Sequence, residues 1–399
     1  MLIEFRIQNF LSFKELQTFT MVKSKSSERP GNAFSIMAEK EFSLLKSAAV
    51  YGPNSCGKSN FLKALSAMKG IVTTTSQRGM KLPLTPFRLN SETVTQPTAF
   101  EVSFIVRDMK YQYGFSASAD QIFDEWLFAF PAGRPQKWFE RVWDAESGKH
   151  LWKFSQFLQG AKKLWQQSTR ENALFLSTSV QLNSEQLKPV FDWFSKTLRF
   201  VGTGVLSPES TARFCTGSGK EDVLKFLKAA DFNIEDIRVE EKHFPTGPTY
   251  EINTVHSDSN CQTVLFNFKD ESSGTQKFFS LAGPILDVLS NGSILCIDDL
   301  DVNLHPELVR LLVELFHDQK VNPKNAQLIF TTHETTILTQ EIFRRDQIWF
   351  CDKNREQASF LYPLSDFSPK KGKENLERGY LSGRYGALPL VRSLYGVQC

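Results

Sequence analysis

The apolar residues in the first hundred or so positions fall into short runs of the kind that form β-strands. These runs predict five strands, at 2–8, 15–21, 46–51, 100–106 and 111–116. After the third of them the spacing changes, because apolar residues from Asn60 to Met68 recur as on one face of a helix until Gly70. We therefore expect a buried strand, a short loop and a helix in succession over residues 46–70.

The pattern changes again between residues 121 and 270. Helical spacing of apolar residues predicts helices at 152–165 and 185–198, and the stretch 207–220 is rich in turn-forming residues. This middle segment lacks the sustained heptads of a long coiled coil. We interpret residues 121–270 as a mostly helical insertion that separates two parts of one core, residues 1–120 and residues 271–399.

Two further apolar runs predict buried parallel strands in the C-terminal part. The run 294–297 is followed by Asp298 and Asp299, and the run 327–330 is followed by two threonines and His333. The carboxyl ends of parallel strands meet at one edge of a sheet, where the ligands of open α/β folds bind. We therefore expect these polar side chains to share a site.

The loop after the third predicted strand carries the pattern G-x-x-x-x-G-K-[ST]. Between a strand and a helix N-terminus, this pattern forms a cradle of backbone N–H groups for the phosphates of a nucleotide. Lys58 would reach the β and γ phosphates of ATP, and Ser59 would hold Mg²⁺. The residues expected to contact the nucleotide are Asn54, Ser55, Cys56, Gly57, Lys58, Ser59 and Asn60.

The acidic pair and the histidine would supply the remaining chemistry. Asp298 is expected to bind Mg²⁺ through water, and Asp299 to orient or deprotonate the attacking water. His333 leaves its strand at the same edge, where it would hydrogen-bond the γ phosphate or that water. Each residue is weak evidence alone, but their positions relative to the phosphate loop predict hydrolysis of ATP.

Composition narrows the class of protein. A chain of 399 residues exceeds the size at which one core usually keeps growing, so a second domain or a large insertion is expected. The net charge of +3 neither predicts nor excludes a nucleic-acid partner. The six cysteines include no C-x-x-C pair, which fits reduced thiols in a cytosol. A charged start and the lack of an apolar run of about eighteen residues predict a soluble, cytoplasmic protein with no membrane partner.

The order of these motifs resembles that of ATP-binding-cassette (ABC) ATPases. The run Glu271-Ser272-Ser273-Gly274-Thr275-Gln276 is similar to the signature sequence of that family. Phosphate loop, signature, acidic strand, a D-loop at Leu300-Asp301 and the switch histidine His333 follow the family order over residues 1–120 and 265–352. The resemblance implies an α/β fold, an ABC/SMC-head-type P-loop NTPase with a mixed sheet core, N-terminal antiparallel strands and a largely helical insertion.

Within that superfamily, residues 3–13 resemble the opening strand of the SMC and RecF branch rather than that of a transporter cassette. The sequence Leu304-His305-Pro306, the signature and the tail at 383–389 are similar to stand-alone bacterial ATPases called AAA15 or RloA-like. Those proteins are relatives of the ATPase half of overcoming-lysogenization-defect (OLD) nucleases. The resemblance implies a separate effector, a nuclease or another toxin, in defence against phage.

The resemblance also implies a homodimer, since in this superfamily two heads enclose two ATP molecules. A larger oligomer is an alternative that the sequence does not exclude. Ser273 and Gly274 of one copy would cap the γ phosphate held by Lys58 of the other, and Asp301 would contribute to the same nucleotide site. ATP binding would then supply dimerisation energy, and hydrolysis would release it.

One position departs from the family, because Asp299 stands where glutamate is usual. The missing methylene withdraws the carboxylate by about 1.5 Å, and a misplacement of about 1 Å can cost on the order of a hundredfold in rate. Slow hydrolysis is therefore expected unless the backbone compensates. The glutamine that contacts Mg²⁺ in the family has no clear counterpart, and Gln96 is the candidate.

Several alternatives stay open. The chain is an ATPase with a regulatory cycle, an ATP-dependent clamp that hydrolyses little, or a RecF- or SMC-like DNA-repair ATPase. A nuclease activity of its own is disfavoured, because about sixty-five residues follow His333 and a Toprim domain needs more. DNA contact is undecided, since the candidate basic residues are scattered or form only a short run. They are Lys162, Lys163, Arg170 and Lys188, and the run Lys370, Lys371 and Lys373.

Overall fold

The computed structural model describes residues 1–36, 42–74, 80–202, 207–244, 247–369, 372 and 374–389. The basic run Lys370, Lys371 and Lys373 lies outside the described residues. Within the described ranges, no helix is long and apolar enough to cross a bilayer.

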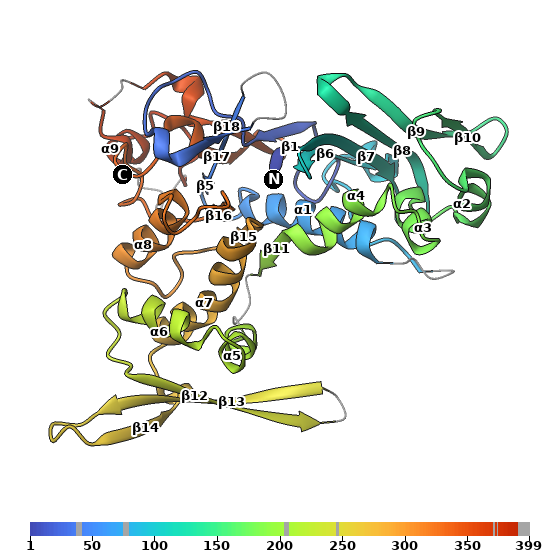
Figure 1. The fold of residues 1–399 in the computed structure, drawn as a ribbon. Coiled ribbons are helices and arrows are strands. Elements are labelled where there is room, and N and C mark those ends of the chain that lie inside the picture. Colours follow the sequence, from blue (N-terminus) through green and yellow to red (C-terminus); the bar gives the residue numbers. More distant parts are fainter. Residues whose placement is uncertain are drawn as a thin grey trace.

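A six-stranded sheet forms the centre of the molecule (Figure 1). Its strand order is β11-β15-β16-β5-β17-β18, and neighbouring strands are parallel except for β17 and β18. Strands β5, β15 and β16 are buried along their whole length, as is typical of central parallel strands. The six strands are β5 (Ser47–Tyr51), β11 (Leu198–Val201), β15 (Ile294–Ile297), β16 (Gln327–Thr331), β17 (Ile348–Lys353) and β18 (Ser359–Pro363).

The central sheet separates two hydrophobic cores, because alternate residues of a strand point to opposite faces. Val50 lies in one core with helix α1 (Lys58–Thr73), whereas Ala49 lies in the other with helices α7 (Ser273–Asn291) and α8 (Pro306–His317). The first core extends into a second sheet of seven antiparallel strands. That sheet has the order β10-β9-β8-β7-β6-β1-β2.

The antiparallel sheet confirms four of the predicted strands and adds three. The predictions near 2–8, 15–21, 100–106 and 111–116 correspond to β1, β2, β6 and β7. The strands are β1 (Leu2–Gln8), β2 (Gln17–Thr20), β6 (Thr98–Val106), β7 (Met109–Ala117), β8 (Ile122–Phe130), β9 (Gln136–Asp144) and β10 (Lys149–Phe154). The fold class expected from the sequence, a P-loop NTPase of ABC/SMC-head type, is confirmed by this arrangement of a mixed core sheet and an N-terminal antiparallel sheet.

Within the described part of residues 121–270, the α-helices lie between 162 and 228, and the seven strands between Ile122 and Asn267 occupy more residues than those helices, so this segment is not mostly helical as expected. The helix expected at 152–165 is wrong, because β10 ends at Phe154 and α2 begins only at Lys162. The turn-rich stretch 207–220 contains helix α5, whose buried Ala212 and Cys215 face a core. The division of the chain at residues 120 and 270 stays a prediction. The helices here are α2 (Lys162–Ser168), α3 (Phe175–Gln181), α4 (Lys188–Asp192), α5 (Glu209–Thr216) and α6 (Lys220–Lys228).

A three-stranded antiparallel sheet follows α6 and extends from the body of the molecule (Figure 1). It consists of β12 (Asp236–Phe244), β13 (Gly247–Ser257) and β14 (Thr263–Asn267), in that order. Hydrophobic spacing did not predict it, because most of its side chains are exposed and show no apolar alternation. The remaining helix and strands are α9 (Leu376–Leu381), β3 (Ala33–Ser35) and β4 (Ser43–Leu45).

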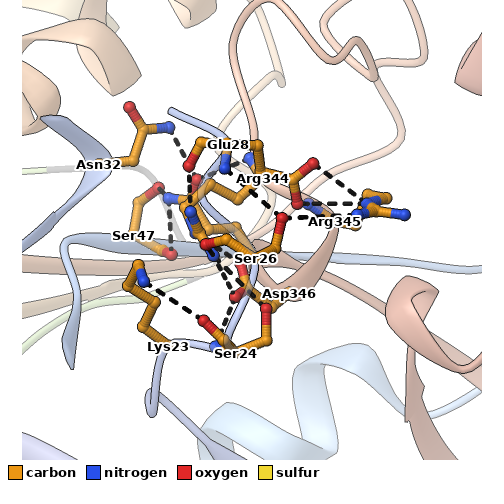
Figure 2. Close-up of polar contacts among 10 residues, drawn as sticks. Lys23, Ser24, Ser26, Glu28, Asn32, Ser47, Arg344, Arg345 and Asp346 are labelled. Atoms are coloured by element: carbon orange, nitrogen blue, oxygen red, sulfur yellow. Dashed lines mark hydrogen bonds and ion pairs between the residues drawn. The ribbon is translucent and has the colours of Figure 1, made fainter. Parts of the chain in front are cut away.

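A buried polar network fastens the N-terminal loop to the segment before β17 (Figure 2). The fully buried Arg344 forms an ion pair with Asp346 at 2.8 Å and donates a hydrogen bond to the backbone carbonyl of Glu28. Arg345 pairs with the carboxylate of Glu28 at 3.1 Å, and the backbone N–H of Ser24 donates to Asp346 at 2.7 Å. Residues more than 300 positions apart in sequence are thus held together beside the central sheet.

Candidate active site

The phosphate loop is a sharp turn between β5 and α1 that requires glycine at two positions. Gly52 and Gly57 have φ angles of +153° and +119°. A Cβ on Gly52 would lie 2.3 Å from the carbonyl oxygen of Cys351, and one on Gly57 would lie 2.3 Å from Oγ of Ser359. The loop therefore delivers the free N–H groups at the start of α1 to one place, as phosphate binding requires.

The predicted nucleotide contacts differ in their exposure. Asn54 and Ser55 are exposed at the tip of the loop, whereas Cys56 and Gly57 are buried. The amide of Asn60 donates a hydrogen bond to Ser12 Oγ at 2.8 Å, so this side chain is engaged by the N-terminal segment. The contact with nucleotide that the sequence predicted for these residues stays a prediction.

The ammonium group of Lys58 is turned into the phosphate loop. Its Nζ donates to the carbonyl oxygens of Gly52 at 2.8 Å and Pro53 at 3.2 Å, and it lies 2.9 Å from Nε2 of His333. Desolvation of the imidazole and the charge of Lys58 lower the pKa of His333. The ring is therefore neutral near pH 7, and its Nε2 lone pair can accept a hydrogen bond from Lys58.

The two aspartates after β15 are held by Thr331, the last residue of β16. Thr331 Oγ1 donates to Asp298 Oδ1 at 2.6 Å and accepts from the backbone N–H of Asp299 at 2.8 Å. Parallel pairing of β15 with β16, and of β16 with β5, brings these groups to the edge that carries the phosphate loop. The sequence analysis assigned no role to Thr331. A hydroxyl residue at the end of a buried strand is the sequence feature that could have indicated its role.

Ser59 and Asp298 are oxygen donors that suit Mg²⁺. Ser59 is the second residue of α1, and the buried carboxylate of Asp298 directly follows β15. Mg²⁺ is usually held by one or two protein oxygens together with phosphates and water. In the described parts of the chain, no group of three or more His, Cys, Asp or Glu residues could hold a metal ion. The donor set fits a Mg²⁺ ion that binds together with the nucleotide.

Gln96 is solvent-exposed and directly follows a short 3-10 helix at 93–95. Its backbone carbonyl accepts a hydrogen bond from the amide of Asn9 at 2.9 Å. At the acidic edge, the N–H of Asp298 donates to the carbonyl oxygen of Val201, at the end of β11, at 3.4 Å. A metal contact by Gln96 stays a prediction.

The signature turn begins helix α7 and touches the acidic loop of its own chain. Ser272 caps the helix by accepting from the N–H of Thr275 at 3.1 Å. One turn later, Lys277 Nζ donates to the backbone carbonyl of Asp299 at 2.9 Å, and Asp301 Oδ1 accepts from the N–H of His333 at 3.2 Å. A hollow of about 820 Å³ opens here, and its lining includes Ser273, Lys277, Asp298, Asp299 and Asn303.

A second hollow, of about 700 Å³, adjoins the phosphate loop itself. Its lining includes Gly52, Asn54 and His333, together with Tyr380 of α9 and Pro389 of the C-terminal tail. The tail motif noted in the sequence therefore lies beside the phosphate loop. Ser273 therefore lines a different hollow from Gly52, Asn54 and His333.

A known protein-family model matches the part of the chain that contains most of these site residues. The family model described as "AAA domain, putative AbiEii toxin, Type IV TA system" matches residues 47–339 of the 399-residue chain, which is well over half of it. The chain belongs to this family. The match runs from β5 to beyond His333, so the phosphate loop, the acidic pair and His333 all belong to this AAA domain.

Solved structures with a similar fold include SMC heads at low identity. The SMC head domain from Thermotoga maritima is 14% identical, with a TM-score of 0.40 over 91% of this chain and 98% of that chain. The Smc head domain from Pyrococcus furiosus, solved with an extended coiled coil and bound to the C-terminal domain of ScpA, is 11% identical, with a TM-score of 0.37 over 91% and 96%. A search of curated proteins finds no match.

Proposed function

We propose that this chain is an ABC-type ATPase that binds ATP and Mg²⁺ between two copies of itself and so regulates a separate effector. The observation that carries the proposal is the division of the site. Gly52, Asn54 and His333 line the hollow beside the phosphate loop, whereas Ser273 lines the other hollow together with Asp298 and Asp299. This division supports a cap for the γ phosphate that comes from the signature turn of a second copy.

In this proposal each residue at the sheet edge has a defined task. The N–H groups of the phosphate loop and Lys58 bind the phosphates, and Ser59 and Asp298 hold Mg²⁺, which neutralises phosphate charge. Asp299 accepts a proton from the attacking water, and neutral His333 orients the γ phosphate or that water. Thr331 fixes both aspartates relative to the loop.

Phosphate release tests the catalytic part. Lys58→Ala should reduce ATP hydrolysis to the background rate, and removal of Mg²⁺ should do the same to wild type. Lys63→Ala is the matched control, because Lys63 is exposed on the same helix. Equal phosphate release by wild type and Lys58→Ala would exclude a function that depends on ATP hydrolysis, and the ATP-dependent clamp would then be the remaining candidate.

A mixing experiment tests whether the signature acts on the partner copy. Lys58→Ala and Ser273→Arg should each be inactive alone. Mixed in equal amounts they should recover about a quarter of the wild-type rate, because half of randomly formed dimers are mixed and each has one intact site of two. Inactivity of the mixture, with both variants folded and able to associate, would place Ser273 and Lys58 in the same site of one chain.

The clamp is the second candidate, and the backbone of Asp299 favours it. Asp299 has φ = +50°, a region that Asp and Asn adopt more readily than Glu. The strand end thus favours the shorter carboxylate at the position of the attacking base. Under the clamp function, ATP would drive association of two copies while phosphate release stayed slow in every variant.

We further propose that the effector is a nuclease or another toxin and that the system acts against phage. The toxin–antitoxin wording of the family description supports this, and so does the similarity to AAA15 or RloA-like ATPases. A DNA-repair role and direct DNA contact are the competing outcomes. Co-purification with the product of the neighbouring gene, followed by a nuclease assay with and without ATP, separates them.

A further inference from the structure

Strand β14 is the exposed outer edge of the three-stranded sheet (Figure 1). All five of its residues are exposed, and three consecutive ones are apolar. Val264, Leu265 and Phe266 have 36%, 50% and 43% of their surface accessible. An edge strand that is apolar and exposed offers both backbone hydrogen bonds and side-chain burial to another strand.

The opposite edge of the same sheet has a different character. Strand β12 carries charges of both signs, at Arg238, Glu240, Glu241 and Lys242, and Lys242 forms an ion pair with Glu251 of β13. Charged side chains on an edge strand oppose pairing with another chain. The sequence Thr-Val-Leu-Phe-Asn of β14 contains neither a charge nor a proline. The β12 edge is therefore protected from pairing with another strand, whereas the β14 edge is suited to such pairing.

We propose that β14 docks onto the β14 strand of a second copy, in antiparallel register centred on Leu265. In that register Val264 lies opposite Phe266 of the other copy, Leu265 lies opposite itself, and Thr263 lies opposite Asn267. Apolar residues then meet apolar ones, polar residues meet polar ones, and no like charges meet. Because the strand is complementary to itself, a two-fold interface satisfies both copies at once.

This docking edge is connected to the signature turn. The ring of Phe266 packs edge-on against His256, with ring centroids 5.0 Å apart. His256 Nε2 lies 2.7 Å from Oε1 of Glu271, which directly precedes the helix cap Ser272. Pairing at β14 can therefore alter the position of the signature turn through Phe266, His256 and Glu271. The pairing itself is independent of the proposed function, but an effect of pairing on ATP binding rests on it.

Sedimentation velocity without nucleotide tests the pairing. Wild type should associate reversibly into dimers, and Leu265→Asp should stay monomeric because two carboxylates would face each other across the interface. Phe244→Asp is the matched control, since Phe244 is 54% exposed on the opposite edge strand; it should dimerise like wild type. Unchanged thermal unfolding and ATP binding of Leu265→Asp would show that the variant is folded.

Cross-linking tests the register. In a Cys261→Ser background, Leu265→Cys should give a covalent dimer with a short bismaleimide in higher yield than Phe244→Cys. Lys58→Ala should leave this dimer unchanged, which separates the pairing from the proposed ATP sandwich. A monomeric wild type, a dimer that Leu265→Asp does not weaken, or occupation of β14 by a different protein would overturn the proposal.

Discussion

Asp299 combines a reactive carboxylate with a strained backbone. Its φ of +50° is in the left-handed region, and its N–H is held by Thr331. Asp and Asn are tolerated in that region, whereas longer side chains are less common there. Because the backbone is fixed from Thr331, a substitution by Asn retains the conformation and changes only the charge. This position therefore allows a clean test of proton transfer.

Asp299→Asn should reduce phosphate release by on the order of 10² to 10⁴, the usual contribution of a general base, without weakening ATP binding. Steady-state phosphate release and equilibrium binding of ATP measure the two quantities. Asp120→Asn, an exposed aspartate on the turn between β7 and β8, is the control. Phosphate release by Asp299→Asn at the wild-type rate would exclude Asp299 as the base.

His317 is held as a neutral base in the polar network behind β5. Its Nε2 lies 2.8 Å from Ser47 Oγ and 3.2 Å from the donor Nε2 of Gln347. Burial, with smaller contributions from Lys46 and Arg29, lowers the pKa of His317 to about 3. Between pH 6.5 and 3 the unfolded chain binds a proton at this residue that the folded chain does not. Stability from His317 is therefore complete above pH 6.5 and decreases as the pH falls.

His317→Gln should remove this part of the pH dependence. From pH 7.5 to pH 5, the unfolding free energy of wild type should fall by about 2 kcal/mol more than that of the variant, as a pKa near 3 requires. Denaturant titrations at both pH values measure the difference. The exposed His243, replaced by Gln, should behave like wild type. Parallel pH profiles of wild type and His317→Gln would show that folding does not lower the pKa of His317.

At the scale of elements, a proline inside the signature helix explains how α5 packs against α7. Pro284 has no N–H, so the carbonyl oxygen of Ser280 lacks its usual partner. The buried Thr211 of α5 donates to the carbonyl oxygens of Phe279 at 2.8 Å and Ser280 at 3.2 Å. Its Oγ1 also accepts from the N–H of Gly283 at 2.9 Å, so one hydroxyl group completes the helix from outside.

Thr211→Val should lower the free energy of unfolding by about 1–3 kcal/mol, because it leaves buried backbone groups without partners while retaining side-chain volume. Thermal and denaturant unfolding measure this loss. Thr216→Val lies on the same helix, where Thr216 is exposed and bonds only to the carbonyl of Arg213; it should cost much less. Equal effects of both substitutions would contradict a special role for Thr211.

The elements that the sequence predicted are those whose side chains are buried on one or both faces. Strand β15 and its two aspartates were found because four apolar residues end at two acids, and α1 because Phe61, Leu62, Leu65 and Met68 repeat at helical spacing. Helix α5 was missed, since its Ser and Thr residues resemble a turn and its packing depends on the distant Pro284. The three-stranded sheet was missed because exposed strands have no hydrophobic period.

The same distinction applies to the candidate site. Local sequence motifs identified Lys58, Asp298, Asp299 and His333, since each directly follows a buried strand or forms part of the phosphate loop. The role of Thr331 depends on which strands are neighbours, and the tether from Lys277 to Asp299 depends on how α7 lies against the loop after β15. Such contacts arise from the fold rather than from a motif.

At the scale of the whole molecule, the two proposals give each copy two separate self-associating surfaces. One needs ATP and joins the phosphate loop to a signature turn; the other needs no nucleotide and joins β14 to β14. A chain with two different two-fold interfaces forms a closed tetramer or an open array when both are occupied. Assembly size should therefore depend on nucleotide in a stepwise manner.

Asp299→Asn allows that dependence to be measured, because it should bind ATP without releasing the sandwich. Light scattering should show dimers of this variant without nucleotide and larger assemblies with ATP and Mg²⁺, which chelation of Mg²⁺ should reverse. The double variant Asp299→Asn, Leu265→Asp should be monomeric without nucleotide and dimeric with it. If ATP left Asp299→Asn at the size of a dimer, the same surfaces would be paired in both states, and two independent interfaces would be excluded.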